Sequence, residues 1–374
     1  MKLIYLASSR IPTEKAHGIQ IMKTCEALAD RGADVVLLIP RRFNSVKDDP
    51  FVYYGVKRNF IIKKLPTLDL IFADKLLGRF PFWLATVTFL LAAKIYLAGK
   101  KYDALYSREQ RVGRFFKNYH LEIHRLPAKI KSGHKKIWQQ AKTLITINNY
   151  LKKGLISQGV EADKILVAPD GVDLDKFDIA LTKQEARAKL KLPLDKKIVL
   201  YTGHLYAWKG ADVLAQAARE LGQDILTVFV GGLDEDAKKF KEKYGHQENI
   251  LILGKKQYNQ IPFYLKAADV LVLPNSGKEP VSKFCTSPMK LFEYMAGGRP
   301  IVASDLPSIR EILNEENAVL VTPDDPSALG KSIRLILGEE ERAKKIAAQA
   351  LKDVQKFDWR KRAKIILELI QNYG

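Results

Sequence analysis

The sequence contains little cysteine, which excludes several classes of small secreted protein. Cys25 and Cys285 are the two cysteines among 374 residues. They are too few for a disulfide framework and too far apart for any metal-binding spacing. The apolar start, residues 1–7, lacks the charged leader and cleavage site of a signal peptide, so we interpret it as a first β-strand. A reducing, cytoplasmic location is therefore expected.

Long uninterrupted apolar runs are also lacking. The longest candidate, residues 80–98, is interrupted by Lys94, whereas a spanning helix needs about 20 consecutive, predominantly apolar residues. We therefore expect this segment to form a buried helix. Hydrophobic residues make up 47% of the chain and charged residues 28%, which is typical of globular domains and not of disordered segments.

Acidic residues are scarce in the first 150 positions. This part holds 27 Lys and Arg but 11 Asp and Glu, whereas the rest of the chain holds 35 and 31, so most of the net charge of +20 lies in one half. Such a half attracts nucleic acid, an acidic lipid surface or a phosphorylated acceptor, unless it is merely a solvated basic surface. No recognition-helix, RNA-binding or stacking-aromatic pattern accompanies the charge, so we expect no nucleic-acid partner.

The chain reads as two α/β units in tandem. A length of 374 residues suggests about two domains, and short β-branched runs alternate with helical periodicity, which predicts parallel sheets with crossover helices. The turn-rich stretch 169–173 marks the boundary. Strands are expected at 3–7, 34–39, 102–106, 143–147 and 165–168, and then at 198–202, 226–230, 250–253, 270–273, 301–303 and 319–321, with helices at about 17–31 and 182–190.

Ligands of such sheets bind beyond the carboxyl ends of the strands, and residues 286–305 contain the strongest local signal there. Ser287 is a good N-cap and Pro288 a good first helical residue, so a helix with an anion-binding N-terminus is predicted. Glu293 lies two turns later in an apolar setting. It either pairs with Lys290 one turn earlier or accepts hydrogen bonds from ribose hydroxyls.

The segment 287–293, with its Gly-rich helix end and the strand 300–303, resembles the donor site of retaining GT-B glycosyltransferases of family 4. That resemblance implies an α/β fold of two facing Rossmann-like, doubly wound domains with an interdomain cleft. It also implies that Ser287, Met289, Lys290 and Glu293 bind the donor nucleotide. The family motif has two glutamates separated by seven residues. Glu293 matches the second, and Cys285 stands where the first, associated with the transferred sugar, is expected.

Three further stretches resemble the same family. In 200–210 the resemblance places Gly203, His204 and Lys209 at the diphosphate, with His204 where arginine is common. In 122–124 it places His124 opposite the donor sugar, and in the first loop it places Gly18 near the diphosphate, with Lys15, His17 or Gln20 at acceptor or phosphate. His124, Lys209 and Glu293 are the implied catalytic residues. The implied domains are residues 1–170 for the acceptor, 171–356 for the donor and 357–374 as a helix returning to the first domain.

The resemblance implies transfer of a sugar from a nucleoside diphosphate sugar to a lipid-linked or glycan acceptor, with retention of configuration, in synthesis of an envelope glycan or exopolysaccharide. No Asp-x-Asp metal motif follows a strand convincingly, so we expect no metal and no other cofactor. The segment 57–79 interleaves Lys63, Lys64 and Lys75 with apolar residues, which suits a peripheral enzyme on an anionic membrane surface. The alternatives are a sugar-nucleotide epimerase or a non-catalytic binding paralogue, because Cys285 replaces a motif glutamate.

Overall fold

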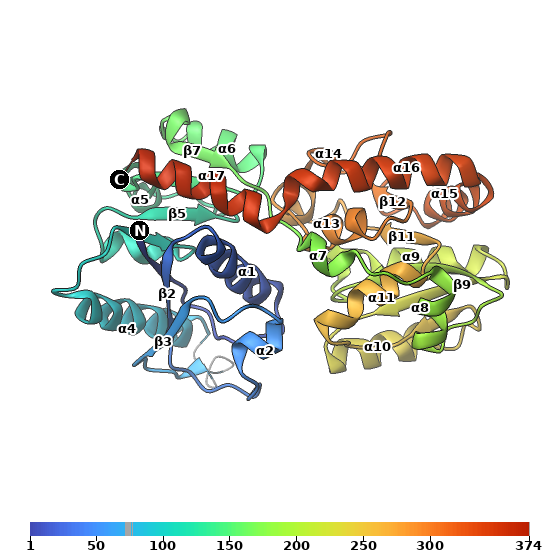
Figure 1. Ribbon diagram of the computed structural model, residues 1–374, viewed down its shortest axis with the longest axis horizontal. Coiled ribbons are helices and arrows are strands. Elements are labelled where there is room, and N and C mark those ends of the chain that lie inside the picture. The colour runs from blue at the N-terminus through green and yellow to red at the C-terminus, as the bar shows by residue number, and fades with distance from the viewer. Residues whose placement is uncertain (72–75, 77, 374) are drawn as a thin grey trace. The chain divides into compact units, whose positions relative to one another are not determined.

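The computed structural model describes residues 1–71, 76 and 78–373. The chain forms two compact units, one made of Met1–Pro169 with the chain from Trp359 onward, and the other of Asp170–Asp358. Each unit is built on a parallel β-sheet flanked by helices (Figure 1). The expected α/β class with two parallel sheets is therefore confirmed. Lys75, part of the predicted membrane-binding segment, lies outside the described residues.

The first unit contains a seven-stranded sheet in the order β3-β2-β1-β4-β5-β6-β7 with parallel neighbours. The strand order reverses between β1 and β4, the kind of switch point at which doubly wound sheets bind ligands. The strands are β1 (Lys2–Leu6), β2 (Asp34–Pro40), β3 (Ile61–Leu65), β4 (Ala104–Ser107), β5 (His120–Ile123), β6 (Thr143–Thr146) and β7 (Ile165–Val167). The helices include α1 (Ala16–Asp30), α2 (Pro50–Tyr54), α4 (Phe80–Leu97), α5 (Ser132–Gln140), α6 (Asn149–Ile156) and α17 (Trp359–Asn372), with 3-10 turns at Gln110–Arg114 and Ala162–Lys164.

Strands β3 and β5 were not predicted, because polar residues interrupt the apolar pattern of both strands. β3 lies at the sheet edge, and its Lys63 and Lys64 side chains are exposed, so the strand resembles a basic surface segment. β5 lies inside the sheet, yet it contains His120 and Glu122, which are both buried. A search for apolar, β-branched runs passes over both.

Helix α4 is only partly buried, which corrects the expectation of a buried helix. Ala85, Phe89 and Ala93 lie on its buried face, and the helix packs against β2 and β3. Its outer face leaves Leu91 46% and Ile95 76% exposed. Among the described residues it is the one helix long and apolar enough to cross a membrane, by length and composition, and 39% of it is buried inside the protein. Core helices of soluble proteins can have the same length and composition.

The last helix, α17, belongs to the first unit. It packs against α1 (Figure 1) and buries Trp359, Ala363, Ile366 and Ile370 on one face. Apolar residues at these spacings form a single stripe along a helix. The first unit is therefore assembled from both ends of the chain.

The second unit contains a six-stranded parallel sheet in the order β10-β9-β8-β11-β12-β13. Its switch point lies between β8 and β11. The strands are β8 (Lys197–Thr202), β9 (Ile225–Val230), β10 (Ile250–Ile252), β11 (Val270–Leu273), β12 (Ile301–Ser304) and β13 (Val319–Val321). The helices are α7 (Leu174–Phe177), α8 (Lys183–Leu190), α9 (Ala211–Ala217), α10 (Asp234–Tyr244), α11 (Ile261–Ala267), α12 (Pro280–Phe284), α13 (Met289–Ala296), α14 (Pro307–Arg310), α15 (Pro326–Gly338) and α16 (Glu340–Asp353), with 3-10 turns at Ala207–Lys209, Ala218–Glu220, Tyr258–Gln260 and Val354–Phe357.

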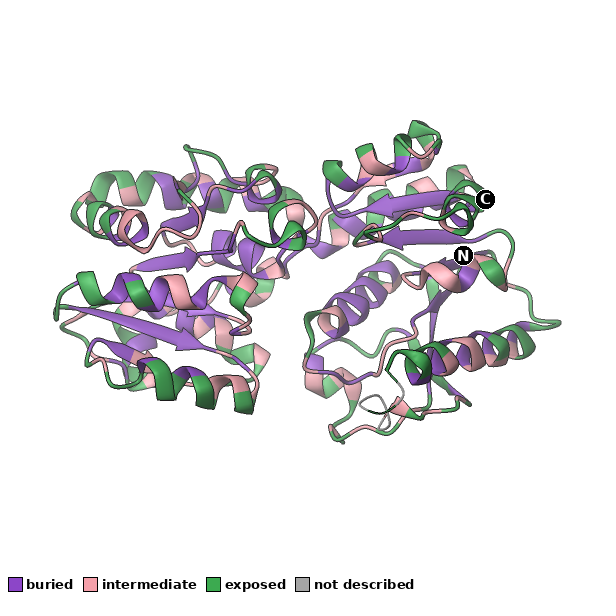
Figure 2. Ribbon diagram, turned by 180° about the vertical axis from the view of Figure 1, so that it is seen from behind, coloured by how far each residue is buried: buried purple, intermediate pink, exposed green. Residues whose placement is uncertain are grey.

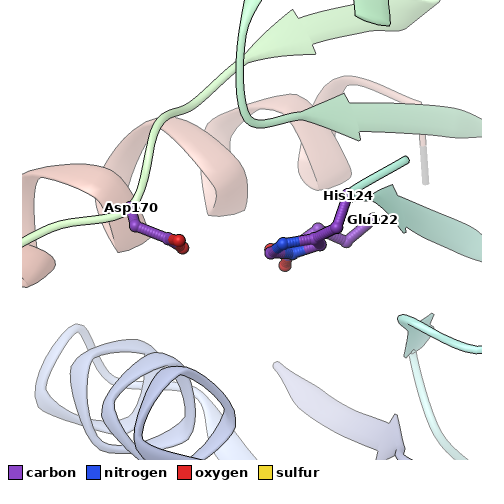
Figure 3. Close-up of side chains that lie close together, drawn as sticks. All are labelled: Glu122, His124 and Asp170. Atoms are coloured by element: carbon purple, nitrogen blue, oxygen red, sulfur yellow. The ribbon is translucent and has the colours of Figure 1, made fainter. Parts of the chain in front are cut away.

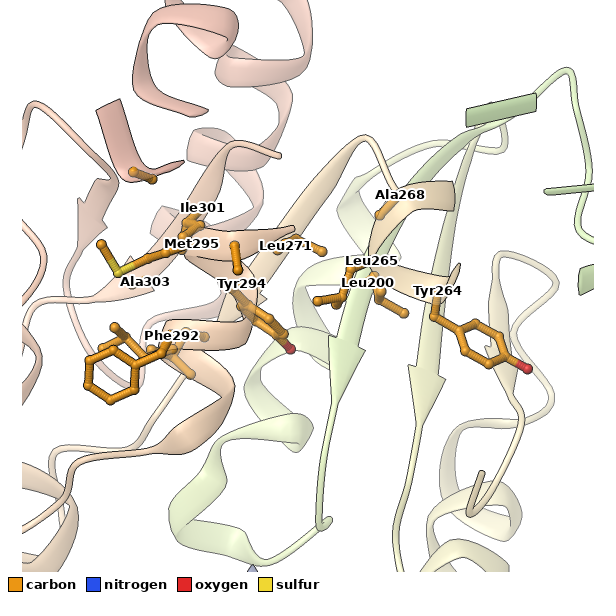
Figure 4. Close-up of a cluster of buried hydrophobic side chains, with 14 of the residues drawn as sticks. Leu200, Tyr264, Leu265, Ala268, Leu271, Phe292, Tyr294, Met295, Ile301 and Ala303 are labelled. Atoms are coloured by element: carbon orange, nitrogen blue, oxygen red, sulfur yellow. The ribbon is translucent and has the colours of Figure 1, made fainter. Parts of the chain in front are cut away.

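Apolar packing fixes helix α13 against the second sheet. Phe292, Tyr294 and Met295 share one buried cluster with Leu271 and Ile301 of neighbouring strands (Figure 4). Buried residues concentrate on the strands and on the inward sides of the helices, whereas exposed residues cover the outer helix faces (Figure 2). Polar residues of α13 are thus carried on an element that cannot move independently of the sheet.

Candidate functional site

The loop after β8 begins at the switch point of the second sheet, with a tight turn at Gly203. Its φ of +120° is accessible to glycine and strained for other residues. The Gly203 backbone N–H donates to the carbonyl of Val230 at 2.8 Å. A Cβ atom at Gly203 would lie 3.6 Å from Nζ of Lys290. The end of β8 and the ammonium group of Lys290 are therefore neighbours.

Two lysines form a cationic cluster beside this strand end. The Lys290 side chain is buried, donates from Nζ to the carbonyl of Thr202 at 3.1 Å, and lies 3.8 Å from the centroid of the Tyr201 ring. Burial, followed by repulsion from Lys209, lowers the pKa of Lys290 well below its ordinary value. Burial also lowers the pKa of Lys209 to about 8. An anion placed here would relieve both costs, since a nearby opposite charge favours the charged form of each lysine.

Glu293 completes the cluster from α13. Burial raises its pKa to about 7, while the hydrogen bond from Tyr258 and the charge of Lys290 act in the opposite direction. The Tyr258 hydroxyl donates to Glu293 Oε1 at 3.0 Å. The sequence suggested that Glu293 could pair with Lys290. In the structure the charge of Lys290 lowers the pKa of Glu293, whereas the hydrogen bond to its carboxylate comes from Tyr258. A buried carboxyl of this kind can accept a second hydrogen bond from a ligand hydroxyl.

The predicted N-cap of this helix is wrong. Helix α13 begins at Met289, its N-cap residue is Pro288, and no side chain caps it. The Ser287 hydroxyl instead accepts a hydrogen bond from the backbone N–H of Asp170 at 3.1 Å. The first N–H groups of a helix have no intrahelical carbonyl to bind. The half-buried Met289 therefore starts a helix whose polar N-terminal end lacks a side-chain cap.

The loop after β8 contains a short 3-10 turn before the next helix. Lys209 ends a 3-10 turn, and α9 begins only at Ala211. Gly210 has a φ of +73°, and a Cβ atom there would lie 1.6 Å from the carbonyl oxygen of Pro274. The loops that follow β8 and β11 are therefore in direct contact. The His204 ring stacks on Tyr206 with centroids 4.9 Å apart.

Cys285 lies at the C-terminal end of α12, where the resemblance leads one to expect a carboxylate. It is half-buried, and burial raises the pKa of its thiol. The thiol therefore supplies neither a negative charge nor a strong acceptor at neutral pH. Glu279 is the N-cap residue of the same helix.

Sequence reasoning missed Tyr258 and Asn275. Tyr258 lies 35 residues before its partner Glu293, and no local pattern connects them. Asn275 follows β11 and its side chain is fully buried. Within the described residues, neither its amide nitrogen nor its amide oxygen has a hydrogen-bond partner. A polar residue two positions after the end of an apolar strand was the available signal.

In the first unit, Gly18 lies near the start of α1 and is packed against Tyr54. A Cβ atom there would meet the Tyr54 hydroxyl at 2.1 Å. That hydroxyl accepts from the Thr13 N–H at 2.6 Å and donates to the Thr13 carbonyl at 2.8 Å. Packing against Tyr54 therefore explains why residue 18 is a glycine, and no bound ligand is needed for that explanation. Its predicted place at the diphosphate stays a prediction.

His124 follows strand β5 and lies beside Glu122 (Figure 3). The His124 Nε2 atom is 2.6 Å from Glu122 Oε1, and the carboxylate side chain has no exposed surface. The side chain of His124 keeps 21% of its surface exposed. An imidazole that is bound by a buried carboxylate and keeps part of its surface exposed can act on a ligand.

Several cations gather around His17, near the start of α1. Burial, followed by the charges of Arg108, Lys15, His124 and Arg10, lowers the pKa of His17 to about 4. His17 is therefore neutral at physiological pH. Gln20, predicted to contact acceptor or phosphate, is instead buried, and its Nε2 donates to Glu122 Oε1 at 2.7 Å.

Residues 182–353 match the family model described as glycosyl transferases group 1. The chain is 27% identical over 223 residues to a D-inositol 3-phosphate glycosyltransferase of Xylanimonas cellulosilytica, covering 56% of this chain and 52% of that protein. It is 30% identical over 202 residues to a Bacillus subtilis glycosyltransferase named for teichuronic acid biosynthesis, TuaC, covering 54% and 49%. The chain thus spans about half the length of these relatives.

Solved structures resemble the chain over nearly its whole length. Sucrose-phosphate synthase of Thermosynechococcus elongatus matches with a TM-score of 0.78 and 21% identity, covering 99% of this chain and 98% of that one. Anabaena HepE, solved with UDP and glucose, matches with a TM-score of 0.75 and 18% identity, covering 99% of both chains. These likenesses bear on the fold. The chain therefore has the GT-B fold, and residues 182–353 of its second unit match the family model of glycosyl transferases group 1.

Proposed function

We propose that this protein is a glycosyltransferase that takes its sugar from a nucleoside diphosphate sugar bound by the second unit. One observation carries the proposal. Lys209 and Lys290 lie together at the switch point of a parallel sheet, with pKa values that burial lowers. A diphosphate is the ligand that compensates the buried Lys290 and the half-buried Lys209 beside it. The UDP complexes of HepE support a uridine nucleotide as the first donor to test.

In this proposal each residue has a distinct role. Lys209 and Lys290 stabilise the charge that develops on the leaving diphosphate, as fixed cations lower the barrier of such steps. Glu293 accepts hydrogen bonds from ribose hydroxyls, and His124 contacts the donor sugar. The reaction retains the anomeric configuration, with the leaving phosphate taking the proton of the acceptor hydroxyl. No metal ion is required, because the two lysines supply the positive charge.

Calorimetric titration with UDP tests the donor site. We expect Lys209→Met to weaken UDP binding by about 10- to 100-fold, the value of one charge-assisted hydrogen bond. Lys238→Met, which removes an exposed lysine of the same unit, is the matched control and should bind as the wild type does. Equal affinities of the two variants, or no binding of UDP or GDP by the wild type, would contradict the proposal.

Product analysis tests the reaction. A labelled donor should give a product of unchanged anomeric configuration by NMR, at a rate insensitive to EDTA. An inverted product or a loss of activity that Mg²⁺ restores would refute the corresponding part. The second candidate, a non-transferring epimerase or binding paralogue, is favoured by the protonated thiol at Cys285. It predicts that the donor binds and is epimerised or left intact whatever acceptor is added.

We further infer that the first unit acts on a lipid-linked or glycan acceptor at the inner face of the cytoplasmic membrane. The outer face of α4 is apolar, since Trp83, Leu91 and Ile95 are 43%, 46% and 76% exposed. The residues 1–150 hold 27 Lys and Arg against 11 Asp and Glu. An exposed apolar helix face within a basic unit suits an anionic lipid surface. The Lys and Arg side chains neutralise the lipid headgroups, and the apolar side chains insert into the interface.

Vesicle flotation tests this location. We expect the wild type to float with vesicles containing phosphatidylglycerol at low salt and to bind neutral vesicles more weakly. Leu91→Glu with Ile95→Glu should reduce flotation at least about tenfold, because each charge opposes burial in the lipid interface. Leu335→Glu changes a residue of the second unit that is 51% exposed, and it should leave flotation intact. Equal flotation of all variants would overturn the role of α4.

A further inference from the structure

The two lysines of the cationic cluster each lie against an aromatic ring. Lys209 Nζ is 3.9 Å from the centroid of the Trp208 ring, and Lys290 Nζ is 3.8 Å from the centroid of the Tyr201 ring. Both distances are well within the range of a cation–π interaction, which extends to about 6 Å. Among the described residues neither lysine forms an ion pair with a carboxylate. Aromatic rings are therefore the partners that both ammonium groups share.

A ring stabilises an ammonium group without neutralising it. The attraction comes from the negative face of the ring, which carries no net charge. A carboxylate partner would compensate the lysine and compete with an incoming anion for it. Burial makes the charged form of both lysines unfavourable, and repulsion between them adds to this cost at Lys290. An aromatic partner reduces that cost and leaves the positive charge available to a ligand.

The half-buried Trp208 lies in the 3-10 turn Ala207–Lys209, which is anchored to the chain after β11. The Trp208 carbonyl accepts hydrogen bonds from the Ser276 N–H at 3.0 Å and from the Ser282 hydroxyl at 3.4 Å. The Lys209 N–H donates to the carbonyl of Tyr206 at 2.8 Å. The backbone is thus fixed at both residues. The direction of the flexible Lys209 side chain then depends on what its ammonium group contacts.

We propose that Trp208 is a positioning residue for Lys209, whose ring keeps the ammonium group charged and holds it in the cationic cluster before an anion binds. A lysine side chain has many rotamers, and ordering it on binding lowers affinity. A contact that exists beforehand reduces this loss. The contact between ring and ammonium group does not depend on the identity of the anion. That the anion is the diphosphate of a sugar donor rests on the function proposed above.

Carbon NMR of the lysine side chains measures the charge of Lys209 in the ligand-free protein. The Lys209 signal is identified by its loss in Lys209→Met. Fluorine withdraws electrons from the face of an indole ring and changes its shape little, so fluorination of Trp208 weakens the attraction and favours the neutral lysine. Mono-, di- and trifluorinated tryptophan at position 208 should therefore lower the titration midpoint of Lys209 stepwise, by about one pH unit over the series.

Fluorination of Trp138, which is buried in the first unit, is the matched control and should leave the titration of Lys209 unchanged. Lys290 repels Lys209 and is itself attracted by Glu293. Both groups are the same in every sample, so their influence cancels in the comparison. A Lys209 midpoint that stays constant throughout the Trp208 series would show that the ring does not hold the charge. This measurement requires no ligand.

Calorimetric titration with UDP measures the consequence for binding. Trp208→Leu, which keeps an apolar contact for the lysine stem, should bind UDP about 5- to 10-fold more weakly, and Trp208→Phe, which keeps a ring, should recover much of the affinity. Added to Lys209→Met, Trp208→Leu should have no further effect, and an additional loss would show that Trp208 acts other than through Lys209. If the Lys209 titration is as expected but the wild type binds no UDP, the proposed donor fails while the positioning stands.

Discussion

Glu293→Gln should stabilise the protein in a pH-dependent way, because the wild-type carboxyl is costly to ionise where it lies. Its pKa is about 7 in the folded protein instead of its ordinary value of 4.5, chiefly through burial. Each pH unit between the two values corresponds to about 1.4 kcal/mol. The ionised carboxylate therefore lowers the free energy of unfolding by about 3 kcal/mol relative to the protonated group.

The sign follows from the folded pKa being the higher one. Stability contributed by the protonated carboxyl is fully present below about pH 4.5 and is lost as the pH rises to about 7. Glutamine keeps an acceptor for the Tyr258 hydroxyl and cannot ionise. The variant should exceed the wild type by less than about 1 kcal/mol at pH 5 and by about 3 kcal/mol at pH 8.

Urea denaturation followed by circular dichroism, performed at several pH values between 5 and 8.5, measures this difference. The relevant quantity is the variant minus the wild type at each pH, because other titrating groups then cancel. Glu316→Gln, at an exposed position of the same unit, is the control and should show no such trend. A difference between Glu293→Gln and wild type that is the same at pH 5 and pH 8 would refute the reasoning.

Two further predictions concern the neighbouring loops. UDP affinity should fall as the pH rises above about 8, because Lys209 loses its proton there. Titration calorimetry of Lys209→Arg should show a weaker decline of the affinity with pH, since arginine stays charged. An equal decline in the variant and the wild type would exclude Lys209 as the cause. Gly210→Ala should lower the free energy of unfolding by more than about 2 kcal/mol, because its φ is +73° and the new Cβ would lie 1.6 Å from the Pro274 carbonyl. Gly254 has a similar φ of +65° with open space around it, so Gly254→Ala should lower the free energy of unfolding by about 1–2 kcal/mol. Thermal unfolding that ranks the two variants in the opposite order would contradict the packing argument.

The parallel strands of the second unit could be predicted from the sequence because they are apolar on both faces. Val270–Leu273 was predicted with its observed bounds, and each of its residues is buried. The charged helix α8 was also predicted, and the structure shows that Thr182 and Glu185 form a capping box at its start. Both signals are local, and local signals survive in a single sequence.

The contacts that shape the candidate sites could not be predicted. Arg362, whose Nη2 donates to Glu122 Oε1 at 2.8 Å, is 240 residues from it in the sequence, and Tyr258 meets Glu293 only after two crossover helices have folded. Strand β5 was missed because its buried polar residues interrupt the apolar pattern. Ser287 was taken for a helix cap because its side chain can cap, whereas tertiary structure uses its hydroxyl for the backbone of Asp170. In each of these cases long-range packing overrides a local preference.

The return of α17 to the first unit makes the order of synthesis matter. The ribosome must complete the whole second unit before it delivers Arg362, so a newly made first unit holds Glu122 without the cation that compensates it. Domains generally fold from the N-terminus as they emerge, and a buried carboxylate without its partner is strongly unfavourable. The surroundings of His124 are consequently among the last parts of the molecule to take their final form, and loss of the final helix would impair a histidine encoded some 240 residues earlier.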